Sequence, residues 1–128
     1  MKVKIGKYKE NRKIDIKIDK YDVWNLDHTL AMIIHPCLLE LKKTKHGSPD
    51  VDNEDVPEEL RSEEHWLTNE QNISVPDSLY HKRWEYVLDE MIWTFKQIAD
   101  GDFPLVAPEE RVDKGLRLFG KYYRGMWT

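Results

Sequence analysis

The first twenty residues alternate between apolar and charged side chains. The apolar members of this pattern are Val3, Ile5, Ile14, Ile16 and Ile18. A period of two with β-branched residues is typical of half-buried strands, and the polar stretch at residues 9–12 is typical of a turn. We therefore predict a β-hairpin over residues 1–20. Because an isolated hairpin is only marginally stable in water, we expect it to pack on helices or to pair with a second copy of the chain.

Three later segments repeat apolar residues every three or four positions, which is the period of one helical face. They predict helices over residues 25–46, 77–99 and 108–126. In the first helix, the predicted buried face consists of Leu26, Leu30, Ile33, Cys37 and Leu41, widened by Ile34 and Leu38. In the second and third, it consists of Tyr80, Trp84, Val87, Met91, Phe95 and Ile98, and of Val112, Leu116, Phe119 and Tyr123. Pro36 lies inside the first helix, so we expect a kink there.

Residues 47–78 follow neither period. They contain Pro49, Pro57 and Pro76 together with many acidic residues, and we predict a long, partly ordered loop with one short helical turn near residues 58–64. The complete prediction is a single domain over residues 1–128 of the α+β class. It is mainly α, with an N-terminal β-hairpin, three main helices and an acidic loop between the first helix and the second.

The composition agrees with one folded domain. The chain has 128 residues, of which 40% are hydrophobic and 34% are charged, so one core and a strongly ionic surface are expected. Cys37 is the single cysteine and lies in an apolar run, which predicts a buried, unreactive thiol in a reducing compartment. The basic start does not resemble a signal peptide, and no apolar run approaches the ~20 residues of a membrane span. We therefore predict a cytoplasmic protein without a membrane anchor.

The net charge of −4 is unevenly distributed along the chain. Lysines dominate residues 1–20, acidic residues dominate 50–64, and residues 111–124 are basic again. The basic ends could bind an anionic ligand, or the blocks of opposite charge could attract one another within or between subunits. The sequence leaves both interpretations open.

Two basic clusters have the composition of a phosphate site. The first, KKTKHGSP at residues 42–49, offers cations, hydroxyls and a glycine. Its simpler interpretation is that the lysines compensate the helix dipole and Gly47 ends the helix. The second is one face of the third helix, with Lys114, Arg117, Lys121 and Arg124 at spacings of three and four. With aromatic residues nearby this face suits a nucleotide, but a solvated face or contact with the acidic loop explains it equally well.

The second helix is dense in aromatic residues. Tyr86 and Trp93 lie off its main apolar stripe, so another surface must cover them, either a second subunit or a nucleobase. On the same helix His81, Glu85 and Asp89 recur every fourth residue and could bind a metal, but no second pair of ligands follows at a defined spacing. The chain has no Gly-rich phosphate loop and no zinc-finger spacing. We therefore expect no enzymatic activity, no cofactor and no resident metal.

Five blocks of the chain resemble a family of small proteins of tailed bacteriophages. They are DHTLAMII at 27–34, TKHGSP at 44–49, DVPEELR at 55–61, RWEYVLDEMIW at 83–93 and GLRLFGKYY at 115–123. The resemblance implies an immune-evasion protein that sequesters a cyclic dinucleotide, such as 3′,3′-cyclic GMP-AMP, without cleaving it. It also implies a homo-oligomer, a dimer or tetramer, in the cytoplasm of the infected bacterium, directed against the cyclic-nucleotide immunity called CBASS. The N-terminal hairpin lies outside the resemblance.

A protein that sequesters a cyclic dinucleotide needs cations for two phosphates and flat side chains for two purines. A symmetric ligand also suits a site where two subunits supply the same residues. For the phosphates we predict Lys45, His46, Arg83, Arg117 and Lys121. For the bases we predict Trp84, Tyr86 and Tyr122.

Two alternative functions remain open. One is a phage protein-interaction module that binds a host protein through the acidic loop, which would become ordered only with its partner. The other is a small metal-dependent nucleotide hydrolase that uses His81, Glu85 and Asp89. Binding to a nucleic acid polymer is disfavoured, because the acidic loop and the net negative charge oppose a large phosphate footprint.

Overall fold

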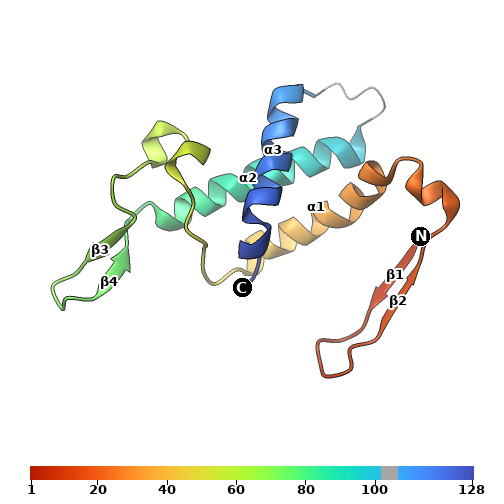
Figure 1. The fold of residues 1–128 in the computed structure, drawn as a ribbon, viewed down its shortest axis with the longest axis horizontal. Coiled ribbons are helices and arrows are strands. Elements are labelled where there is room, and N and C mark those ends of the chain that lie inside the picture. Colours follow the sequence, from red (N-terminus) through yellow and green to blue (C-terminus); the bar gives the residue numbers. More distant parts are fainter. Residues whose placement is uncertain (102–106) are drawn as a thin grey trace.

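The computed structural model describes residues 1–101 and 107–128. Its elements follow in the order β1 (Lys2–Ile5), β2 (Ile14–Lys17), η1 (Lys20–Val23), α1 (Leu26–Thr44), η2 (Asn53–Asp55), η3 (Glu58–Leu60), β3 (Trp66–Thr68), β4 (Ser74–Pro76), α2 (Tyr80–Asp100), α3 (Glu109–Tyr122) and η4 (Tyr123–Gly125), where η is a 3₁₀ turn. The predicted class is confirmed: an N-terminal antiparallel strand pair is followed by three main helices (Figure 1).

Helix α2 forms the centre of the molecule. It contacts both α1 and α3, and α3 crosses the α1–α2 pair (Figure 1). The buried apolar residues of α2 are Tyr80, Trp84, Val87, Leu88, Met91 and Phe95. They recur every three or four positions, so the period read from the sequence marks the buried face of this helix. The core between the helices is completed by Ala31 and Leu38 of α1 and by Leu118 and Tyr122 of α3.

The helix bounds lie within a few residues of the predicted ones. Helix α1 ends at Thr44, α2 begins at Tyr80, and α3 ends at Tyr122 before the chain continues into η4. Pro36 lies inside α1, as the sequence predicts. Among the helices that the structure describes, none combines the length and the apolar character needed to cross a membrane.

The buried face of α1 differs from the predicted one. Ala31 and Leu38 are buried, whereas Leu30 and Ile33 are 41% and 38% exposed. Cys37 is also exposed, so the prediction of a buried thiol is wrong. Apolar residues cover two neighbouring faces of this helix. A helical period shows that such faces exist but does not determine which one the core covers.

The acidic segment at residues 47–78 is more regular than predicted. It contains η2, η3 and a second hairpin, in which Leu67 of β3 lies opposite Val75 of β4. Val51 and Val56 are buried in the main core. Strands of three residues are too short to show a period of two in the sequence, which is why the prediction missed them. The segment therefore belongs to the folded body.

The predicted N-terminal hairpin is confirmed, and it stands apart from the helices. Val3 lies opposite Ile16, and Ile5 lies opposite Ile14. Every residue of both strands is exposed, and the hairpin extends away from the helical body (Figure 1). The prediction allowed it to pack on the helices or to pair with a second copy. Within the described residues, the helices do not bury it.

Candidate functional site

The structure distributes the eight predicted ligand residues over three places. Arg83 and Trp84 lie inside the fold. Tyr86, Arg117, Lys121 and Tyr122 lie at the contacts of α3 with α2 or with the acidic segment. Lys45 and His46 line a surface hollow at the end of α1. A single copy of the chain therefore does not bring all eight together.

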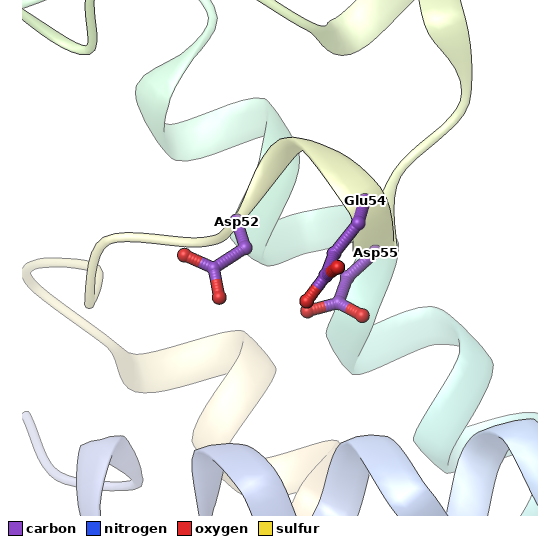
Figure 2. A group of neighbouring side chains, drawn as sticks. All are labelled: Asp52, Glu54 and Asp55. Carbon is purple, nitrogen blue, oxygen red and sulfur yellow. The ribbon is translucent and has the colours of Figure 1, made fainter.

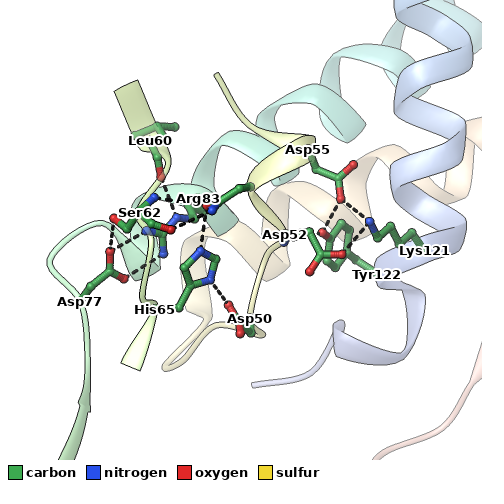
Figure 3. A network of polar contacts seen from close by, with 11 residues as sticks. Asp50, Asp52, Asp55, Leu60, Ser62, His65, Asp77, Arg83, Lys121 and Tyr122 are labelled. Carbon is green, nitrogen blue, oxygen red and sulfur yellow. Dashed lines mark hydrogen bonds and ion pairs between the residues drawn. The ribbon is translucent and has the colours of Figure 1, made fainter. Parts of the chain in front are cut away.

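Arg83 is completely buried and its guanidinium is used within the chain (Figure 3). Its Nη1 and Nη2 donate to the two carboxylate oxygens of Asp77 at 2.8 and 2.5 Å, and its Nε donates to the Leu60 carbonyl at 2.6 Å. Ser62 donates to the same carboxylate at 2.7 Å. The hydrogen bonds from Arg83 lower the pKa of Asp77 to about 2, against the opposing effect of burial. The prediction that Arg83 contacts a phosphate is therefore corrected: it joins the acidic segment to α2.

Acid should weaken this attachment. The Asp77 pKa falls from 3.8 to about 2 on folding, so the folded state favours the ionised carboxylate. Its contribution, about 2 kcal/mol, is complete above about pH 4 and is lost as the pH falls towards 2. In urea denaturation over this range, the free energy of unfolding should decrease as the pH is lowered. Asp77→Asn should make the free energy of unfolding depend less on pH. An unchanged slope in the variant would contradict the assignment to Asp77.

Trp84 is also unavailable to a ligand. It is 1% exposed, and its ring meets the Tyr122 ring edge-on with centroids 6.0 Å apart. Tyr122 is 7% exposed, its hydroxyl donates to Asp55 at 2.5 Å, and it accepts the backbone N–H of Asp52 at 3.0 Å. The prediction that these two rings stack on purines is corrected, because the core of this copy already covers them.

The basic face of α3 meets the acidic segment. The carboxylates of Asp52, Glu54 and Asp55 converge (Figure 2), and the Lys121 ammonium lies 2.8, 2.9 and 2.6 Å from them. Arg117 adds a second cation, 2.9 Å from Asp55. The sequence left open whether this face contacts a ligand, solvent or the acidic loop. In the structure it contacts the acidic loop. Within one copy, Arg117 and Lys121 are already paired with carboxylates.

Asp55 is the centre of this network (Figure 3). Its side chain is fully buried, which disfavours the charged form, but hydrogen bonds from Lys121, Tyr122 and Arg117 outweigh burial and lower its pKa. The same contacts raise the pKa of Lys121, first through Asp52 and then through Asp55. Lys121 and Arg117 supply two positive charges to the three carboxylates, so most of the negative charge of this cluster is neutralised within the chain.

Cations of α3 cover the two aromatic residues that lie off the main stripe of α2. The Lys114 ammonium donates to the Tyr86 hydroxyl at 2.5 Å and lies 4.8 Å from the ring centroid. The Arg111 guanidinium lies 3.9 Å from the centroid of Trp93. The sequence predicted that a second subunit or a nucleobase covers these rings. In the structure they are half-buried, and a neighbouring helix supplies the cover through cation–π contacts.

The remaining predicted residues, Lys45 and His46, line a hollow with a volume of about 200 Å³. Gly47, Ser48 and His81 complete it, so it forms where the end of α1, the start of the acidic segment and the start of α2 meet. Ser48 Oγ lies 2.9 Å from His81 Nδ1. The sequence did not predict Ser48 and His81 as partners, because 33 positions separate them.

Thr128 contacts one of the residues that line this hollow, His46. The His46 backbone N–H donates to the Thr128 hydroxyl at 2.9 Å, and the ring Nδ1 lies at the same distance from it. Lys45 forms an ion pair with Glu85 of α2. The hollow therefore presents an ammonium, a hydroxyl and two imidazoles.

The predicted metal-binding row on α2 is used for other contacts. Lys45 and Lys42 pair with Glu85, and Lys42 lies 2.5 Å from Asp89. His81 faces Ser48. Among the described residues, the three acids around Lys121 form the group that has the spacing of metal ligands. The row on α2 does not converge in that way, so the structure gives no support to the hydrolase alternative.

A second, larger hollow lies on the acidic segment. It measures about 560 Å³ and is lined by Ser62, Glu63, Glu64, Leu67, Asp77 and Ser78. Glu63 and Glu64 are exposed, and so is Trp66 beside them, at 49%. From the sequence, this region is recognisable only as rich in acidic residues. The concave surface was not predicted, because it depends on the β3–β4 hairpin that the prediction missed.

Comparisons of the chain with protein-family models, with curated proteins and with solved structures find no significant match. The fold and the contacts above therefore carry the functional argument. The resemblance to bacteriophage proteins stays a prediction.

Proposed function

We propose that this protein is a non-catalytic binding protein that sequesters a cyclic dinucleotide, with one phosphate held in the hollow of Lys45, His46, Ser48 and His81. The observation that carries the proposal is the convergence in this hollow of an ammonium, a hydroxyl and two imidazole rings. The Lys45 ammonium has further N–H groups beside its ion pair with Glu85, and a phosphate oxygen would have to replace the hydrogen bond that Ser48 and His81 share. A protein that stores a ligand needs such donors and needs no nucleophile.

The size of the hollow limits what one copy holds. Pockets that enclose a drug-sized ligand measure about 300–1,000 Å³, and this hollow measures about 200 Å³. A phosphate with part of its ribose fits that space. We therefore propose that a cyclic dinucleotide with two phosphates spans the hollows of two copies. The biological setting that follows from the phage resemblance is evasion of bacterial cyclic-nucleotide immunity in the infected cytoplasm.

Thermal unfolding with a panel of cyclic di- and trinucleotides tests this proposal. At 100 times its dissociation constant a ligand stabilises the fold by about 2.7 kcal/mol, which raises Tm by about 10 °C in a domain of this size. We expect such a shift with one cyclic dinucleotide and its recovery intact after heating. Absence of a shift with every nucleotide would refute the proposal, and recovery of a cleaved product would favour an enzyme.

Matched lysine variants locate the site. Lys45→Ala should abolish the shift, because it removes the ammonium from the hollow. Lys96→Ala should retain the shift. It is a suitable control because Lys96 also pairs with an acid of α2, Asp100 at 2.7 Å, but is not among the residues that line the hollow. Equal shifts in the two variants would exclude this hollow as the binding site.

The acidic hollow favours a second candidate function, a protein-interaction module that binds a basic segment of a host protein. Glu63 and Glu64 are exposed and give this hollow a negative lining, and exposed Leu67 adds an apolar contact. The segment is already part of the folded body, so we do not expect it to become ordered only on binding. A lysine-rich peptide that raises Tm where nucleotides do not would favour this candidate.

A further inference from the structure

The N-terminal hairpin has one apolar face and one charged face. Opposite pairs in an antiparallel register share a face, and here Val3 faces Ile16 while Ile5 faces Ile14. These four side chains are 44–65% exposed. The remaining strand residues, Lys2, Lys4, Asp15 and Lys17, lie on the other face. A two-stranded sheet with an uncovered apolar face needs further strands or a partner to be stable.

Among the described residues, no strand pairs with the outer edge of β2. The Gly6 N–H donates to the Lys13 carbonyl at 2.8 Å, which makes Gly6 and Lys13 a hydrogen-bonded pair. Because such pairs alternate along an antiparallel ladder, the backbone groups of Ile14 and Ile16 point away from β1. They form an unpaired edge of the kind that recruits a strand from another chain.

We propose that two copies of the chain pair β2 with β2 in antiparallel fashion about a two-fold axis, forming a four-stranded sheet with Ile16 opposite Ile16 of the second copy. This register places Asp15 of each copy opposite Lys17 of the other, so the interface contains two attractive pairs. It also places Ile14 opposite Ile18, which continues the apolar face across the axis. This dimer is independent of the proposed nucleotide site.

Charge selects this register over its neighbours. Outward-pointing residues must face each other, so the axis can shift by one residue to pass through Asp15 or Lys17. Either shift places identical charges directly opposite, which is destabilising. The outward-pointing residues of β1 are Val3 and Ile5, so pairing β1 with β1 instead centres on Val3, on Lys4 or on Ile5. When the axis passes through Ile5, Lys4 faces Gly6 and no attractive pair forms. When the axis passes through Val3, Lys2 faces Lys4, and when it passes through Lys4, that lysine faces itself. The β2 edge is thus the self-complementary one.

A two-fold arrangement also explains why the assembly would close. Pairing β1 of one copy with β2 of the next would leave free edges at both ends and would continue into a filament. Pairing β2 with β2 uses the complementary edge of both copies. It leaves outside the two β1 edges, whose Lys2 and Lys4 oppose further strand addition.

The test is the molar mass of the full chain in solution, measured by light scattering across a concentration series. We expect twice the monomer mass of 15.3 kDa, or a larger even multiple that contains the same pairing. Lys17→Asp should weaken the association at least about tenfold, because it turns both Asp15–Lys17 contacts into repulsive ones. The double variant Asp15→Lys with Lys17→Asp exchanges the charges and should restore association.

Two controls distinguish a loss of association between copies from a loss of stability of the hairpin itself. Within one copy residue 17 lies opposite Lys2, so Lys17→Asp improves the charge pairing inside the hairpin while damaging it between copies. Lys7→Asp makes the same charge change outside the strands and should leave association unchanged. A 15.3 kDa mass at every concentration, equal association of Lys17→Asp and Lys7→Asp, or failure of the double variant to recover would each overturn the proposal.

Discussion

Replacing Arg83 by methionine is expected to lower the free energy of unfolding by about 3–5 kcal/mol. Methionine fills much of the space of the arginine side chain, so the cost comes from the partners that are left behind. The buried Asp77 carboxylate loses two hydrogen bonds and the Leu60 carbonyl loses one. A buried charge without its partner is among the most destabilising changes that one substitution can make.

Urea denaturation followed by circular dichroism measures this effect. Arg111→Met is the matched control, because the Arg111 side chain is 46% exposed, with its guanidinium paired to Glu90 at 3.0 Å and lying over the Trp93 ring. An exposed pair contributes only about 0–1 kcal/mol. Adding Asp77→Asn to Arg83→Met should recover part of the loss, since the unpaired charge is removed. If Arg83→Met unfolded at the same urea concentration as Arg111→Met, the buried ion pair between Arg83 and Asp77 would be contradicted.

The second large effect is expected at Gly115 of α3. Among the described glycines, it is the one that lies closest to a neighbouring side chain, Thr94 of α2. A Cβ atom at this position would lie 2.5 Å from Cβ and 2.9 Å from Cγ2 of Thr94. Both distances are shorter than carbon atoms tolerate, and the neighbouring atoms belong to a buried side chain. Gly115→Ala should therefore force the helices apart and lower the free energy of unfolding by about 3 kcal/mol.

Gly120 provides the control within the same helix. No other group lies within 4 Å of a Cβ built there, so Gly120→Ala should raise the free energy of unfolding by about 0.5–1 kcal/mol, because alanine favours the helix. The two substitutions are chemically identical and should have opposite signs in the same denaturation experiment. A stabilising Gly115→Ala would contradict the observed packing of α3 on α2.

These contacts change the interpretation of the predicted binding residues. Residue type alone favours cations and aromatic rings as ligand groups, but Arg83, Arg117, Lys121 and Tyr122 hold the acidic segment against the helices. Substitution of any of them would reduce binding by disturbing the fold. Lys45 is the informative residue for the ligand experiment, because it lines the hollow and its other contact is a partly exposed ion pair.

The sequence by itself determined the N-terminal hairpin, the three main helices and the fold class. The period of two in residues 1–20 and the buried stripe of α2 are local properties of the chain, and both hold in the structure. The sequence left open whether the blocks of opposite charge bind a ligand or attract one another. Lys45, His46, Gly47 and Ser48 are adjacent along the chain, so the sequence could group them as one candidate site. All four line the same hollow.

Only the tertiary structure decided how those local features are used. Lys121 meets Asp52, Glu54 and Asp55 across more than sixty positions, and Ser48 meets His81 across 33. The period of α1 allowed two apolar faces, and packing against α2 selected one. A helical or strand period specifies which residues share a face. The partner of that face, and whether a charge meets a ligand or another side chain, depends on contacts between segments distant in sequence.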